Sequence, residues 1–162
     1  MSVIAAEILY YYTGTGSQAA PGGSLGGSIT ANECGTAINH LFDNVSPTEA
    51  TAGDTEYRAI SVKNTNATDT LYDAYIWISL ETVSTGSIIA IGYDSTGTQS
   101  VANESTAPSG ISFSTPLTKA TGISLGDMAA GVAKRIWVRR TITAGAVKLA
   151  DNGTMITEGG TY

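Results

Sequence analysis

Apolar and polar residues alternate along several short stretches of the chain, and a period of two is typical of a half-buried β-strand. In the clearest stretch, residues 71–80, Tyr72, Ala74, Ile76, Ile78 and Leu80 share one face of the predicted strand. Tyr75 and Trp77 fall on the other face, and Trp137 is placed in the same way in a second strong strand at 134–143. Further strands are expected at 57–63, 87–93, 111–114, 121–125, 146–150 and 154–157.

Turn signals separate these stretches. Ser46, Pro47 and Glu49 form a capping box that predicts one short helical turn at 46–52. The triplet 151–153, Asp-Asn-Gly, is typical of a tight hairpin. The many short strands without a long amphipathic helix predict an all-β fold, an antiparallel β-sandwich of either jelly-roll or immunoglobulin-like topology.

The N-terminus has a different pattern from the rest. Residues 4–12 are mostly apolar, whereas 13–29 are rich in Gly and Ser and cannot hold regular structure alone. We therefore expect an extended N-terminal arm and linker over residues 1–30, followed by a sandwich domain over 31–162. Six apolar and aromatic residues of this arm are candidates for contact with another subunit: Ile4, Ile8, Leu9, Tyr10, Tyr11 and Tyr12.

The length and net charge of the chain limit the classes of function that it can have. The chain has 162 residues, enough for one domain with a real core, and its net charge is −6. This charge argues against a nucleic-acid-binding protein, even though four of the eight basic residues lie within 134–140. Arg135 and Arg139 are therefore predicted to face an acidic protein surface. Tyr75, Trp77 and Trp137 are expected either at a contact with another layer or subunit or beneath the N-terminal arm or a loop of the same chain.

Groups that could perform chemistry are few. Cys34 and His40 occur once each and are interpreted as structural, and no metal-ligand set, phosphate-binding loop or nucleophile motif is present. The acidic pair Asp54 and Glu56 is interpreted as solvated turn carboxylates. We expect no enzyme activity and no cofactor. The sequence also lacks a signal peptide, a membrane-spanning stretch and a second cysteine, which favours folding in a reducing cytoplasm.

Several segments resemble a group of short virion structural proteins of tailed bacteriophages. The similar segments are 53–66, 69–74, 101–104, 107–113, 123–131 and 136–140. The resemblance implies a virion component such as a capsid decoration (cement) protein, with the major capsid protein and copies of itself as partners and the capsid surface as its location. A tail, neck or head-fibre component remains open, as does a receptor- or glycan-binding immunoglobulin-like module. The resemblance carries over no binding residues.

Overall fold

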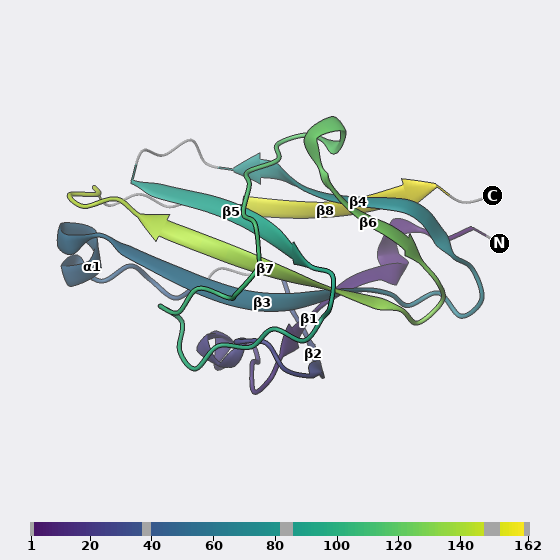
Figure 1. Ribbon diagram of the computed structural model, residues 1–162, viewed down its shortest axis with the longest axis horizontal. Helices are drawn as coiled ribbons and strands as arrows, with labels where there is room; N and C mark the ends of the chain where they lie inside the picture. Colours follow the sequence, from purple (N-terminus) through teal and green to yellow (C-terminus); the bar gives the residue numbers. More distant parts are fainter. Residues whose placement is uncertain (1, 37–39, 82–85, 148–152, 161–162) are drawn as a thin grey trace.

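The protein is an all-β sandwich of two antiparallel sheets, as expected (Figure 1). The computed structural model describes residues 2–36, 40–81, 86–147 and 153–160. The larger sheet has the order β2-β1-β3-β7-β5, and the smaller has the order β6-β4-β8. The strands are β1 (Ile8–Thr13), β2 (Ile29–Glu33), β3 (Asp54–Asn64), β4 (Leu71–Glu81), β5 (Ser87–Asp94), β6 (Ile123–Met128), β7 (Ala133–Ile142) and β8 (Gly153–Gly160).

Helical structure is confined to short turns. The described part of the chain has one α-helix, α1 (Pro47–Ala52), and three 3-10 turns: η1 (Ala5–Glu7), η2 (Pro21–Gly23) and η3 (Lys119–Thr121). The predicted capping box of α1 is confirmed, because the Glu49 backbone N–H donates to Ser46 Oγ at 3.2 Å and the Ser46 N–H donates to Glu49 Oε2 at 2.6 Å. None of the described helices is long and apolar enough to cross a bilayer.

The core lies between the two sheets, where the aliphatic faces of their strands meet. Ile136 and Val138 of β7 lie opposite Ile60 and Arg58 of β3, so even-numbered residues of both strands point inward. The buried core cluster comprises Ile8, Ile60, Val62, Leu71, Ala74, Ile76, Ile78, Ile91, Leu125, Met128, Ile136 and Val138.

Two residues that were expected on the buried face of β4 are in fact exposed. Tyr72 is 36% exposed and Leu80 is 61% exposed, whereas Ala74, Ile76 and Ile78 are buried as predicted. The pairing of β4 with β8 shifts register between Tyr72 and Tyr75 and again between Ile78 and Leu80. Each irregularity reverses the alternation and turns the terminal side chain outward, and Asp73 at the first one has a positive φ of 47°.

The extended N-terminal arm is not confirmed, because the N-terminal residues belong to the larger sheet. Residues Ile8 to Tyr12 of β1 pair with Asn64 to Ile60 of β3, and β2 pairs with β1. Ile8 is 9% exposed and Tyr12 is fully buried. The apolar character of this segment thus reflects packing within the chain's own sandwich.

Two long segments cover the outer face of the larger sheet. Figure 1 shows the green segment between β5 and β6 passing in front of β3, β7 and β5. Within this cover, the N–H of Val101 donates to the carbonyl of Leu25 at 3.0 Å, and Gly26 forms a bridge with Ser100. A Cβ on Gly26 would lie 2.2 Å from the Gln99 carbonyl, so only glycine allows the Gly-rich segment 14–28 to approach residues 99–101 this closely.

Two of the predicted strands, 111–114 and 146–150, do not appear as strands among the described residues. Residues 111–114 form no named strand, although Ser114 exchanges backbone hydrogen bonds with Ile91 at the edge of β5, at 2.8 and 3.0 Å. Residues 146 and 147 are not in a strand, and 148–152, which include most of the predicted hairpin turn, lie outside the described residues.

Candidate functional site

The outer face of the smaller sheet carries a group of apolar side chains that we call the outer patch: Tyr75, Trp77, Leu80 and Ile156. Trp77 lies opposite Ile156 across β4 and β8, on the side away from the core residues Ile76 and Ile78. Leu80 and Ile156 are 61% and 39% exposed, and Tyr75 is half-buried. Trp77 itself is only 8% exposed, so it forms the floor of the patch, and the two aliphatic residues supply its accessible surface.

One ion pair borders the outer patch. Lys119 Nζ in η3 lies 3.3 Å from Glu158 Oε1 in β8, and both side chains are about half exposed. Glu158 is opposite Tyr75 in the β4–β8 pairing, which places the ion pair at one end of the patch. The patch therefore combines exposed aliphatic surface with a locally neutral margin, a composition typical of a protein-binding surface.

Trp137, the other predicted contact aromatic, is on the outer face of the larger sheet but is fully buried by the chain itself. It lies opposite Ala59 on one side and Gly92 on the other. A Cβ on Gly92 would come within 2.5 Å of Ile111 and 2.7 Å of the Ser112 carbonyl, so the segment after β5 packs directly over this position. Of the two alternatives, an internal cover or a partner subunit, the structure shows an internal cover for Trp137.

The predicted basic stripe at 134–140 does not form one surface, because successive residues of β7 point to opposite faces. Arg135 is 6% exposed beneath the Gly-rich segment, where its guanidinium donates to the Gly27 carbonyl at 2.5 Å and to Ser61 Oγ at 3.2 Å. Arg139 is half-buried with its guanidinium 5.2 Å from the Phe113 ring centre. Neither is an open basic side chain on the surface, and this corrects the expected electrostatic contact.

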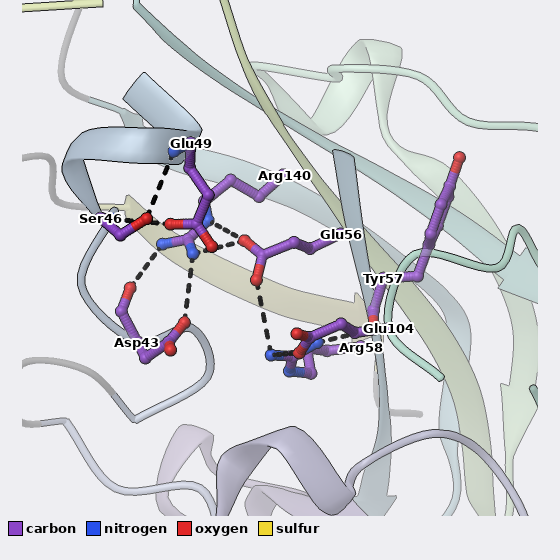
Figure 2. Close-up of polar contacts among 8 residues, drawn as sticks. All are labelled: Asp43, Ser46, Glu49, Glu56, Tyr57, Arg58, Glu104 and Arg140. Carbon is purple, nitrogen blue, oxygen red and sulfur yellow. Dashed lines mark hydrogen bonds and ion pairs between the residues drawn. The ribbon is translucent and has the colours of Figure 1, made fainter. Parts of the chain in front are cut away.

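Arg140 points to the inner face and belongs to a buried charge network (Figure 2). Its Nε donates to Glu56 Oε2 at 2.6 Å, and a terminal nitrogen donates to the Asp43 carbonyl at 2.7 Å. Arg58 lies 3.7 Å from Glu56 Oε1 and also pairs with Glu104. Glu56 was expected to be a solvated carboxylate, but its side chain is only 2% exposed.

Burial raises the pKa of the Glu56 carboxyl above its usual value, and the adjacent guanidinium groups of Arg140 and Arg58 oppose that rise. Phe42 lies against both guanidinium groups, at 4.7 Å from Arg140 and 5.3 Å from Arg58. The network thus holds the segment around residues 40–46 against the inner face of β3 and β7, which is a structural role. The sequence did contain a hint of this burial, because Glu56 and Arg58 lie at alternate positions with Ile60 and Val62 and so share their inward face.

The predicted N-terminal contact residues have unequal exposure. Ile8 and Tyr12 are buried, and Tyr10 packs against the core with its hydroxyl 2.8 Å from Thr157 Oγ1. Leu9 and Tyr11 are half-buried on the opposite face of β1, and Ile4 is 58% exposed. The structure does not bring these residues and the outer patch together on one strand or one sheet.

The described residues offer little for catalysis. Burial raises the pKa of the half-buried Cys34 thiol to about 12, which makes it a poor nucleophile at neutral pH. Among the residues that the structure describes, no group of three His, Cys, Asp or Glu side chains is placed to hold a metal. A hollow beside α1 is lined by Pro47, Thr48, Thr51 and Ala52, none of which titrates.

Comparisons with protein-family models, with curated proteins and with solved structures find no match to this chain.

Proposed function

We propose that this protein is a non-enzymatic structural component of a tailed-phage virion: a capsid decoration (cement) protein that binds the lattice of the major capsid protein. The outer patch is the surface assigned to that contact. The observation that carries the proposal is that Leu80 and Ile156 are exposed beside Trp77 on the smaller sheet, whereas the equivalent Trp137 of the larger sheet is fully covered by the chain and Ile88 is exposed there apart from it.

A decoration protein requires a rigid body and a surface for its partner rather than an active site. The buried charge network supports a rigid body. So do the backbone hydrogen bonds that join the two segments covering the larger sheet. Exposed Leu and Ile beside a largely buried Trp resemble the anchor and rim of a protein interface. The segments similar to phage virion proteins, which include 69–74 at the start of β4, support the same function.

The test is cosedimentation of the purified chain with capsids of the phage that encodes it. Leu80→Ser removes exposed apolar surface from the central strand of the smaller sheet. We expect it to weaken binding at least about fivefold, equivalent to about 1 kcal/mol. The matched control is Ile88→Ser in β5, where an isoleucine that is 45% exposed lies on the other sheet, and its binding should match that of the wild type.

Equal capsid binding by the Leu80 and Ile88 variants would contradict the assigned surface. Copy number tests the location in the virion, since decoration requires hundreds of copies in each particle. A few dozen copies or fewer would instead favour a neck, tail or fibre component.

A further inference from the structure

The structure leaves one long strand edge unpaired in the part of the chain that it describes. β8 lies at the end of the smaller sheet and, among the described strands, pairs only with β4. Figure 1 shows β8, in yellow, running beside β4. The backbone N–H and C=O groups on the outer edge of such a strand can form a ladder with a further strand.

The other edges of the sandwich are covered, short or charged. Ser114 bonds to the edge of β5, and the Pro116 carbonyl accepts from the Ile78 N–H at 2.8 Å where β4 extends beyond β6. β6 lies against β5 and β7. β2 has only five residues and ends in exposed Glu33. β8 has eight residues without proline or lysine, and within the described part of the chain it pairs only with β4.

Charge also favours β8 as a contact for a like-charged chain. Two copies that each carry a net charge of −6 repel each other, so their contact needs a locally neutral surface. The single charged residue of β8, Glu158, is already paired with Lys119. The exposed Ile156 beside this edge offers apolar surface that a neighbouring strand would bury.

We propose that a second copy of this chain pairs its β8 antiparallel to β8, so that two three-stranded sheets become one six-stranded sheet. With a two-fold axis between the two copies, each β8 pairs with the same strand of the other copy, and Ile156 of one copy lies near the apolar Ile156 of the other. This inference goes beyond the proposed function, because it concerns the chain alone and holds whatever surface the protein binds.

Sedimentation equilibrium of the isolated chain tests the pairing without a capsid. We expect a monomer–dimer equilibrium with a Kd of roughly 1–100 µM, as for a small interface. Ile156→Lys places two positive charges near each other across the axis and should weaken dimerisation at least about tenfold. The control is Ile88→Lys in β5, a substitution of the same kind at a similar exposure, which should dimerise like the wild type.

Amide hydrogen exchange locates the contact. Exchange in β8 should slow when the protein concentration rises above the Kd, whereas exchange in β2, an edge strand of the larger sheet, should not change. Thr154→Lys, at an exposed position of the same strand, gives a second variant if Ile156→Lys unfolds. A chain that stays monomeric at 1 mM, about tenfold above that range, would overturn the proposal. So would full dimerisation of a folded β8 variant, or a dimer whose β8 amides exchange as fast as those of the monomer.

Discussion

Arg140 and Lys119 each form an ion pair with a glutamate, but the two pairs lie in different environments. The Arg140 side chain is 10% exposed and its partner Glu56 only 2% exposed, whereas Lys119 and Glu158 are 46% and 58% exposed. Removing one partner of a buried pair leaves the other charge without compensation in a medium that solvates it poorly. An exposed charge, in contrast, regains its hydration.

Arg140→Met should therefore lower the free energy of unfolding by about 3–5 kcal/mol, because it leaves the Glu56 carboxylate buried with only Arg58 nearby. Lys119→Met, the matched control, should change it by less than about 1 kcal/mol. Urea denaturation of the two variants measures both values. A similar small effect of both substitutions would mean that water reaches Glu56.

Cys34 leads to a second prediction at the residue scale. Burial raises the pKa of its thiol from 9.0 to about 12, which leaves roughly a thousandfold less thiolate at pH 8 than in an unfolded chain. We expect slow reaction with a chromogenic disulfide reagent in buffer and fast reaction in concentrated urea. Comparable rates in the two conditions would show that the thiol is accessible in the folded protein.

At the scale of elements, β1 determines what truncation does. It lies inside the larger sheet, paired with both β2 and β3, and its Ile8 and Tyr12 side chains are buried. Loss of these two side chains alone removes about 3–6 kcal/mol of apolar burial, a large part of the roughly 5–15 kcal/mol that stabilises a typical domain.

Deletion of residues 1–24 should consequently abolish cooperative unfolding. A chain that begins at Val3 serves as the control and should unfold like the full chain. Circular dichroism during urea titration distinguishes the two outcomes. A sharp transition in the protein that begins at Leu25 would instead support a separable N-terminal arm.

Local patterns predicted individual elements well. Alternation over 57–63 and 87–93 corresponds to β3 and β5, and the capping box at Ser46 corresponds to α1. The same patterns missed the bulges of β4, because a register shift depends on the partner strand and leaves no mark in one strand's own alternation. They also missed that β1 is internal to a sheet, since an apolar run followed by glycines is compatible with either an arm or a strand.

The candidate site was only partly predictable for the same reason. Tyr75 and Trp77 were correctly placed on the face opposite the aliphatic residues of β4. Leu80 and Ile156, which provide the exposed area, were missed because one follows a bulge and the other lies on a strand whose pairing was unknown. Burial of Arg135 depends on contact with Gly27, more than a hundred residues away, which no local pattern records.

At the scale of the whole molecule, the tyrosines of β1 and Cys34 link stability to alkaline pH. Burial raises the pKa of Tyr10 and Tyr12 from 10.0 to about 12, and that of Cys34 from 9.0 to about 12. Because the folded-state values exceed the unfolded ones, this contribution to stability is complete below pH 9 and is lost as the pH rises toward 12.

The free energy of unfolding should therefore fall between pH 9 and pH 12, as urea titrations at fixed pH would show. Cys34→Ala removes the group that titrates first and should move the onset of this fall to about pH 10. Unchanged stability up to pH 12 would argue that these side chains are accessible when the protein is folded.

The segments that cover the larger sheet contain turns on the opposite side of the molecule from the outer patch, and peptides could be inserted into these turns. Gly97 and Gly110 lie in this cover, and both have positive φ angles typical of tight turns. A Cβ on either glycine would meet no atom within 4 Å, so both turns face open space. A peptide tag inserted at either turn would project from the cover of the larger sheet, whereas the outer patch lies on the smaller sheet. These two turns are thus natural positions for displaying a foreign epitope away from the surface proposed for capsid binding.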